Sequence, residues 1–557
     1  MASPPVADFR PDFYPDPHGM PLDRNIVLGA MAHTTDGLTH AALLRMAWAR
    51  DPDWRCATWL DAGLTLTAPS NAMHTWLFDQ CAMIPPWAPG RTGKRISLES
   101  PRSSGKTTTI KGVLAWLAIS GREPHIMAIS VTQMESRVMI RHLRTMLEDL
   151  SACPEFVSIY GELRLTEATD SALHVTTAHG GHLGKPTECH ISGRWTGGAV
   201  RGANHQGQRP TFILLDDTES ATKARNPANR DNFDEWVKKD VVPCGPPDQS
   251  HVVIAIGTRV HPDSLLARMH GDTSWQSGLF RALPREPLNR EGWEHVRALW
   301  SDLNDPSRED TAREYYAAHR NELDAGASVL WPDMLGLIDI MLLRFQLGES
   351  AFQQEFQNNP VPDGTIQLDP RSIATITQAQ QTFDTRRIVF FLDPAATSSP
   401  TSDYSAIVGV HRDSRGYYDI VHLDVKRRSP SAQVAALWAA ADKWGIDPLF
   451  CVESNGFQAM LLDEINRTRL ERRRAGKVFG MRTKAVTTTK NKNERIAALE
   501  PLLANGWVRA VSGLDRGVLD DQLTSWPNGR HDDAVDALVA AIEQLTHGVT
   551  VRLGGYL

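Results

Sequence analysis

The sequence predicts an α/β protein with two domains, the first of which contains a parallel sheet. Strand and helix signals alternate from Lys94 to about Arg285, and a second alternating series starts at Arg387. This rhythm is typical of parallel strands joined by crossover helices. A Pro- and Gly-containing break, Asn359–Gly364, separates the two series, and 557 residues give each domain enough chain to bury its own core.

Three segments are expected from this pattern. Residues 1–65 are predicted to form a Pro/Asp-rich arm with a helix near Thr39–Ala49, residues 66–362 a first domain that includes a helical linker, and residues 363–557 a second domain. The strands expected in the first domain are Arg95–Glu99, Ile126–Ser130, Thr211–Asp216 and His251–Gly257. Those expected in the second are Arg387–Leu392, Tyr404–His411, Tyr417–Val425 and Leu449–Glu453. The helices include Thr107–Ile119, Gln133–Leu150, Leu335–Gly348, Ser431–Trp444, Phe457–Arg467, Ile496–Leu503 and Asp532–Leu545.

A phosphate-binding loop is predicted between the first strand and the helix that follows it. Its residues are Ser100, Pro101, Arg102, Ser103, Ser104, Gly105, Lys106 and Thr107. In such a loop, backbone N–H groups and the helix N-terminus face the phosphates. Lys106 is expected to reach the β- and γ-phosphates of ATP, and the Thr107 hydroxyl to hold Mg²⁺. Ser100 replaces the usual first glycine; a coincidental turn is the alternative, and the strand–loop–helix context disfavours it.

The apolar strand 212–215 ends in two carboxylates, as expected of the partner of such a loop. Asp216 is predicted to order the Mg²⁺ of MgATP. Asp217 stands where many ATP-driven motors carry a glutamate that orients the attacking water. Because aspartate is one methylene shorter, Glu219 is an alternative, and a helix-capping role for Asp217 is another. Together the motifs predict a P-loop NTPase domain of the parallel-sheet ASCE type that uses ATP with Mg²⁺.

Three further residues of this domain are candidates for coupling and for catalysis in a neighbouring subunit. Thr258 follows the strand Val252–Gly257 and is expected to couple hydrolysis to movement. Arg201 and Arg209, which precede the Asp216 strand, are candidates for an arginine finger offered to an adjacent copy of the chain.

Acidic residues in the last third predict two-metal phosphodiester cleavage. Asp393 and Glu453 each end an apolar strand, while Asp532 and Asp533 open a very apolar helix in which Asp532 and Asp536 share one face. Carboxylates that converge from two strands and a helix hold paired Mg²⁺ or Mn²⁺ ions. N-capping accounts for Asp532 or Asp533 alone but not for all three positions. This order of acidic residues is the ribonuclease H-like pattern, and Asp403 is expected to lie near Asp393.

Basic residues near this helix are candidates for DNA contact. Residues 380–557 hold 23 of the 59 Lys and Arg residues but 21 of the 66 Asp and Glu residues, so they are more basic than the rest. Lys490, Lys492 and Arg495 are expected to touch DNA phosphates, with a solvated helix start as the alternative. His179, His182, Cys189 and His190 superficially suggest zinc, but their spacing matches no common four-ligand pattern.

The sequence resembles the large terminase subunits of tailed bacteriophages, which package viral DNA and cut it. The resemblance runs from about Ser97 to Ala541. It is carried by Ser100–Thr107, Leu214–Asp217, Gly257–Asp263, Phe352–Pro360 and His531–Leu538, taken in this order. Ser100 and Asp217 depart from the family pattern.

The resemblance implies a DNA-packaging ATPase and nuclease that acts on double-stranded DNA. It also implies a small terminase subunit and the procapsid portal protein as partners, with a homo-oligomeric ring, a pentamer in the family, on the portal. The expected location is the cytoplasm of an infected bacterium, transiently at the portal and not in the mature virion. No apolar run approaches the ~18–20 residues of a membrane helix, so no membrane association is expected.

Two other functions use the same modules. One is a helicase-nuclease of the repair type, although no additional helicase motif follows Asp216. The other is an inactive prophage protein that keeps the fold as a DNA-binding scaffold, which the intact acidic and phosphate-loop residues disfavour.

Overall fold

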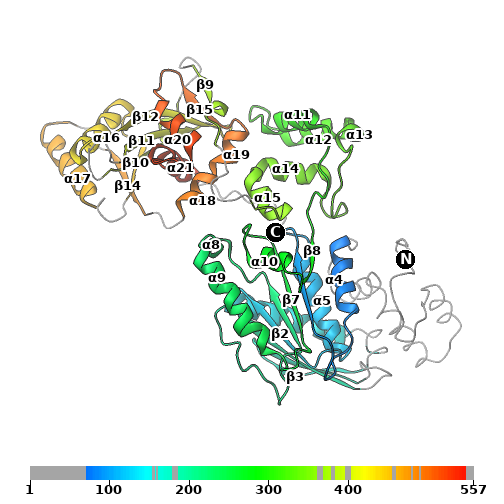
Figure 1. Ribbon diagram of the computed structural model, residues 1–557. Helices are drawn as coiled ribbons and strands as arrows, with labels where there is room; N and C mark the ends of the chain where they lie inside the picture. Colours follow the sequence, from blue (N-terminus) through cyan, green and yellow to red (C-terminus); the bar gives the residue numbers. More distant parts are fainter. Residues whose placement is uncertain are drawn as a thin grey trace. The chain divides into compact units, whose positions relative to one another are not determined.

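The computed structural model describes residues 71–152, 157, 161–178, 186–360, 368–377, 383–395, 403–453, 459–477, 481–487 and 491–546 (Figure 1). The predicted N-terminal arm and its helix lie outside these residues. The chain forms two compact units. The first comprises residues 1–285, 328–336 and 353–360, and the second residues 286–327, 337–352 and 361–557.

The first unit contains an eight-stranded sheet in the order β3-β4-β5-β2-β6-β7-β1-β8. The strands are β1 (Lys94–Glu99), β2 (His125–Ser130), β3 (Leu163–Ala168), β4 (Ala172–Thr177), β5 (Thr187–Trp195), β6 (Phe212–Asp216), β7 (Val252–Gly257) and β8 (Gln276–Leu279). The run from β5 to β8 is parallel, with β1 between β7 and β8, in agreement with the predicted parallel-sheet domain. The strands β3, β4 and β5, which pair antiparallel, add an edge that the sequence did not predict.

Helices cover both faces of this sheet because its central strands are apolar on both sides. Alternate β2 residues belong to different cores: Ala128 packs with α5 (Lys106–Ile119) and α6 (Gln133–Ser151), and Ile129 packs towards α9 (Pro227–Trp236) and α10 (Leu265–Gly271). Fully buried parallel strands of this kind carry apolar residues at successive positions. The arrangement fixes the carboxyl ends of β1, β6 and β7 at one edge.

The second unit contains a seven-stranded mixed sheet in the order β14-β13-β10-β11-β12-β15-β9. The strands are β9 (Ala374–Ile376), β10 (Ile388–Asp393), β11 (Ser405–Arg412), β12 (Tyr418–Lys426), β13 (Leu449–Glu453), β14 (Arg482–Val486) and β15 (Val508–Val511). The strands β10, β11 and β12 are antiparallel, whereas β13 pairs parallel with β10. This is the predicted ribonuclease H-like fold, with three short strands, β9, β14 and β15, that the sequence did not predict.

Helices again cover both faces of the second sheet. Phe391 packs with α21 (Asp533–Thr546), and Phe390 packs with α16 (Pro430–Trp444) and α17 (Ala459–Arg474) on the other face. The single helix expected at 496–503 is two short helices, α18 (Lys492–Ala497) and α19 (Leu499–Ala504), because Ala498 ends one and precedes the other.

Five described α-helices lie between the two sheets in the sequence. They are α11 (Arg290–Ser301), α12 (Arg308–Ala318), α13 (Arg320–Leu323), α14 (Leu337–Leu347) and α15 (Glu349–Gln357). The sequence placed this region in the first domain, but α11, α12, α13 and α14 group with the second unit. In the described part of the chain, no helix has both the length and the apolar character needed to span a bilayer.

Candidate ATP-binding and nuclease sites

The predicted phosphate loop connects β1 to the N-terminus of α5. Gly105 has φ +80° at the helix start, and a Cβ there would lie 2.8 Å from His74 Nε2, so a side chain is excluded. No side chain caps α5, which leaves its first N–H groups for an anion. The Ser100 and Ser104 hydroxyls lie 2.7 Å apart across the loop, which gives Ser100 a structural role at the usual glycine position.

His74 also supports the loop, and the sequence analysis missed it. It lies in α4 (Ala72–Ala82), and its Nε2 is 2.7 Å from the Ser104 carbonyl oxygen. Its ring packs edge-on against Trp331 with centroids 4.8 Å apart. Burial lowers the pKa of His74, so the neutral ring donates from Nε2. Only the tertiary fold brings a residue so far upstream to the loop.

The residues predicted to bind MgATP converge at the carboxyl edge of the first sheet. Lys106 Nζ lies 3.2 Å from Asp217 Oδ2 and 3.3 Å from Thr258 Oγ1. The Thr107 hydroxyl donates to Asp216 Oδ1 at 3.4 Å. Burial and the neighbouring Asp217 carboxylate raise the pKa of Asp216, as expected of a carboxylate placed to bind a cation. A lysine, a hydroxyl and a buried carboxylate at one helix N-terminus fit the chemistry of MgATP.

Asp217 and Glu219 have different partners. Asp217 has φ +44°, and its Oδ1 accepts the Thr258 backbone N–H at 3.1 Å. Glu219 instead accepts the Leu265 backbone N–H at 2.8 Å, at the start of α10. Only Asp217 of the two contacts Lys106, so the geometry favours Asp217 as the carboxylate that orients water.

Asp217→Asn is expected to reduce ATP turnover by about 10²-fold or more, the usual contribution of general-base chemistry. Glu219→Gln is the matched control, since it removes a neighbouring charge that supports α10. It is expected to keep turnover while lowering the melting temperature. Steady-state phosphate release by both variants decides the assignment. A loss in Glu219→Gln as deep as that in Asp217→Asn would contradict it.

Thr258 links the phosphate loop to the Asp217 turn. Its hydroxyl donates to the Ser100 carbonyl at 3.3 Å and accepts from Lys106. The adjacent Arg259 pairs with the buried Glu99 at the end of β1, and its backbone N–H donates to Asn358 Oδ1 at 2.9 Å. This network joins four of the segments that carry the family resemblance and places Thr258 where a coupling residue is expected.

The two arginine-finger candidates have partners away from the phosphate loop. Arg201 is an exposed side chain that pairs with Asp240, and Arg209 donates to the Gly245 carbonyl at 3.3 Å. Neither partner belongs to residues 100–107. A role in a neighbouring subunit remains a prediction for both.

The acidic residues of the second unit also converge. Asp393 and Glu453 end two adjacent parallel strands, with Leu392 opposite Val452, so their carboxylates lie at one edge of the sheet. The first turn of α21 adds Asp533 and Asp536, since α21 packs on β10. Burial raises the pKa of Asp393 well above its usual value, and the negative charges of Asp536, Glu453 and Asp533 raise it further. Such mutual repulsion fits a site for divalent cations.

Asp536 belongs to this cluster although the sequence analysis assigned it no role. It accepts a 2.6 Å hydrogen bond from Arg495, and both side chains are buried. Its three-residue spacing from Asp533, which places both on one helix face, was the available signal. Asp532 instead pairs with Lys492 at 2.7 Å.

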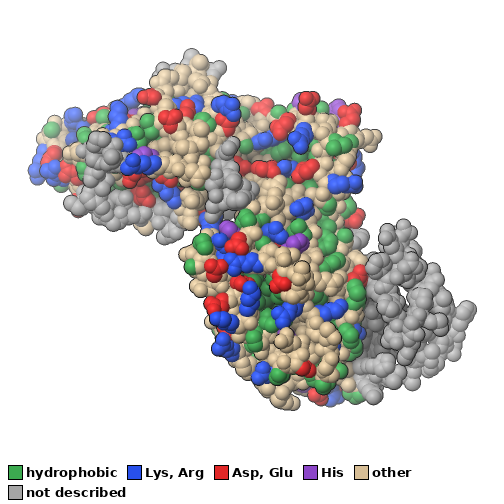
Figure 2. All heavy atoms as spheres, viewed as in Figure 1, with side chains coloured by type: hydrophobic (Ala, Val, Ile, Leu, Met, Phe, Trp, Pro, Cys, Tyr) green, Lys and Arg blue, Asp and Glu red, His purple; other side chains and the backbone are tan. Residues whose placement is uncertain are grey.

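The predicted DNA-contacting residues have distinct environments. Lys490 lies outside the described residues. Lys492 bridges Asp532 and Asp536, and Arg495 is only 5% exposed, which favours a structural role for Arg495 over contact with a phosphate. Basic side chains on α17 are interspersed with acidic ones on the face drawn in Figure 2, and Arg467 pairs with Glu464 at 2.5 Å.

A second group of possible metal ligands borders the first. Asp403, His531 and Asp533 each offer one ligand atom, all within 4.8 Å of one another, and His531 Nδ1 lies 3.2 Å from Asp403 Oδ1. Asp533 Oδ2 also accepts the Tyr404 backbone N–H at 3.0 Å. Because Asp533 belongs to both groups, the residues fit two neighbouring cations.

Asp393→Asn is expected to stabilise the metal-free protein, because it removes one charge from this carboxylate cluster. The folded chain holds the Asp393 proton more tightly than the unfolded chain, so wild-type stability falls as pH rises through the raised pKa. In EDTA at alkaline pH the variant is expected to melt about 2–4 °C higher, equivalent to ~1 kcal/mol. The difference should shrink at acidic pH. A variant that melts lower than the wild type at both pH values would contradict this.

Comparison with known proteins identifies the larger part of the second sheet and its helices. Residues 391–545 match the family described as terminase RNaseH-like domain, and the match spans all four carboxylates of the Asp393 cluster. No curated protein matches the sequence. Residues 391–545, within the second unit, therefore form a terminase RNaseH-like domain. The resemblance to bacteriophage large terminase subunits is thereby confirmed.

Several solved structures are similar to the chain at low identity. The large terminase of bacteriophage HK97 is 14% identical, covers 81% of this chain and 91% of its own, and has a TM-score of 0.27. The large terminase of a thermophilic bacteriophage is 10% identical, with coverages of 86% and 99% and a TM-score of 0.44. The P22 large terminase nuclease domain is 13% identical, with coverages of 33% and 94% and a TM-score of 0.25.

Proposed function

We propose that this chain is the motor and nuclease subunit that packages bacteriophage DNA. It hydrolyses ATP to move double-stranded DNA into a procapsid and cuts concatemeric DNA. The main support for this proposal is the convergence of Lys106, Thr107, Asp216 and Asp217 at one edge of the first sheet. The second unit of the same chain contains a terminase RNaseH-like domain.

In the ATP half, the N-terminus of α5 and Lys106 bind the phosphates. Thr107 and Asp216 hold the Mg²⁺ of the substrate, and Asp217 orients the attacking water. Because Lys106 contacts Asp217 and Thr258 before ATP binds, arrival of a γ-phosphate competes for the lysine. This competition frees Asp217 from Lys106. It also changes the contacts of Thr258, which is hydrogen-bonded to both the phosphate loop and the Asp217 turn. Arg201 or Arg209 of a neighbouring subunit supplies the arginine finger.

In the nuclease half, Asp393, Glu453, Asp533 and Asp536 hold two divalent cations, Mg²⁺ or Mn²⁺, with Asp532 in support. Bound cations supply an activated water and stabilise the leaving oxygen. Arg495 fixes the rotamer of Asp536 through their buried hydrogen bond, and Lys492 offsets the charge of Asp532 and Asp536. His531 orients Asp403 beside Asp533.

The partners follow from the same proposal. They are double-stranded DNA, a small terminase subunit that selects it, and the portal protein, on which the chain forms a ring. The chain acts in the cytoplasm of the infected bacterium and leaves before the virion matures.

ATP turnover with and without double-stranded DNA, together with plasmid cleavage in Mg²⁺ and Mn²⁺, tests the proposal. DNA-stimulated turnover and metal-dependent cutting are both expected. A strand-displacement assay separates the helicase-nuclease alternative, which unwinds a duplex. Absence of ATP turnover would instead support an inactive scaffold.

A further inference from the structure

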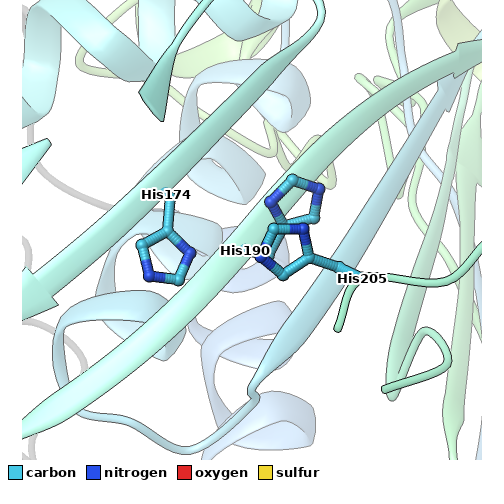
Figure 3. A group of neighbouring side chains, drawn as sticks. All are labelled: His174, His190 and His205. Atoms are coloured by element: carbon cyan, nitrogen blue, oxygen red, sulfur yellow. The ribbon is translucent and has the colours of Figure 1, made fainter. Parts of the chain in front are cut away.

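Three histidines from separate segments meet on one face of the first sheet. His174 in β4 and His190 in β5 are directly opposite in the antiparallel register. His205 lies in a tight turn closed by reciprocal backbone hydrogen bonds with Gln208, at 3.0 and 2.8 Å. One ring nitrogen from each histidine lies within 4.8 Å of the other two, as the rings in Figure 3 illustrate.

One buried ring nitrogen of each of these three histidines lacks a hydrogen-bond partner. His174 Nδ1, His190 Nδ1 and His205 Nε2 are buried, and none of these described atoms has a protein partner. The adjacent His125 differs, because its two nitrogens lie 3.1 Å from the Gln208 carbonyl and 3.2 Å from the Ser192 hydroxyl. Buried polar atoms are normally paired, so an unpartnered nitrogen on each of three neighbouring histidines needs an explanation.

We propose that His174, His190 and His205 bind a transition-metal ion of the zinc class. Imidazole is a preferred ligand of such ions, and Glu167, whose Oε2 lies 3.8 Å from His190 Nδ1, supplies a carboxylate for the fourth position. Burial, aided by the surrounding histidines, lowers the pKa of His190 to about 3, so its ring is neutral at pH 7. Neutral rings present the lone pairs that metal binding requires.

Binding requires a local adjustment of the rings. His190 and His205 stack with centroids 3.8 Å apart and planes only 6° from parallel. A metal ion lies in the plane of each ring that binds it, so two stacked rings cannot both bind until one rotates about χ2. Zinc–nitrogen bonds of ~2.0–2.1 Å in a tetrahedron place the nitrogens roughly 3.3 Å apart. The turn that holds His205 contacts the sheet through the hydrogen bond between His125 and the Gln208 carbonyl. This turn is not paired with a strand of the sheet, so it can move when a ring rotates.

This site differs from those already described. It lies beside His125, the first residue of β2, and so at the amino end of that strand, whereas the phosphate loop lies at the carboxyl edge. It also differs from the set suggested by spacing, because Cys189 and His190 are neighbours in β5 and point to opposite faces. Cys189 packs in the core with α5 and α6. A bound metal would attach the turn between Arg201 and Arg209 to the strands β4 and β5.

Zinc titration of the full-length protein tests the proposal directly. The protein is stripped with a chelator and titrated with Zn²⁺ against a chromophoric competitor, in excess Mg²⁺ to occupy the carboxylate sites. The wild type is expected to bind about one Zn²⁺. His205→Ala and His174→Gln are expected to bind it at least ~10-fold more weakly. Co²⁺ in place of Zn²⁺ should give the visible absorption of a tetrahedral site, which both variants lose.

The matched control is His142→Ala, which removes an exposed histidine on α6 and should bind Zn²⁺ like the wild type. Circular dichroism verifies the fold of each variant, and the half-exposed His174 makes His174→Gln the milder change. Unaltered Zn²⁺ affinity in both cluster variants would overturn the proposal. So would an equal loss in His142→Ala, or no Zn²⁺ binding by the wild type in Mg²⁺.

Discussion

Lys106→Ala is expected to abolish ATP hydrolysis, with a loss of at least ~10²–10³-fold, the scale for removing one donor that stabilises developing charge. Lys106 is buried at the N-terminus of α5, and within the described residues no other lysine or arginine pairs with Asp217. Plasmid cutting should remain detectable, because the carboxylates that would perform it belong to the other unit. Phosphate release and nicking of supercoiled plasmid measure the two activities.

Lys94→Ala provides the control for this substitution. Lys94 begins β1, at the opposite end of the strand from the phosphate loop, so its loss should leave turnover near the wild-type rate. Retained ATP turnover in Lys106→Ala would refute the phosphate-loop assignment.

Asp393→Ala is expected to abolish DNA cutting while sparing ATP turnover. Asp393 lies at the centre of the carboxylate cluster, where Asp536, Glu453 and Asp533 all raise its pKa. Removing it takes away a ligand for both proposed cations, and a loss of several kcal/mol of transition-state stabilisation corresponds to a rate reduction of ~10³-fold or more. Linearisation of supercoiled plasmid in Mg²⁺ and in Mn²⁺ measures the effect.

Asp413→Ala is the matched control for Asp393→Ala. Asp413 pairs with Arg415 and Arg509, outside the carboxylate cluster, so its removal should leave cutting intact even if stability falls. Equal loss of cutting and ATP turnover in Asp393→Ala would indicate misfolding or a different nuclease site.

The parts of the fold that the sequence predicted are those with short-range signals. The phosphate loop is contiguous, and the four apolar strands around it end at, or are followed by, polar residues that share one edge of a parallel sheet. Asp393, Glu453 and the start of α21 were found in the same way, since each follows or begins a strongly apolar segment. Because these strands are buried on both faces, they are apolar at successive positions, and this made them easy to predict from the sequence.

The missed features depend on pairings between distant segments. The strands β3 and β4 have mixed burial and pair only with each other and with β5, so their sequences carry a weak strand signal. The contact of His74 with Ser104 and the meeting of His174 with His190 and His205 arise from register and topology. Arg495 was predicted to bind DNA because its charge suggests exposure, whereas Asp536 holds it in the interior.

The most direct test of whether one chain holds both a motor and a nuclease is to measure both activities in each variant. ATP turnover and plasmid cleavage are measured side by side for the wild type, Lys106→Ala and Asp393→Ala. We expect both activities in the wild type, only cutting in Lys106→Ala and only ATP turnover in Asp393→Ala. Loss of both activities in each well-folded variant, or persistence of both, would contradict the proposed division of the chain.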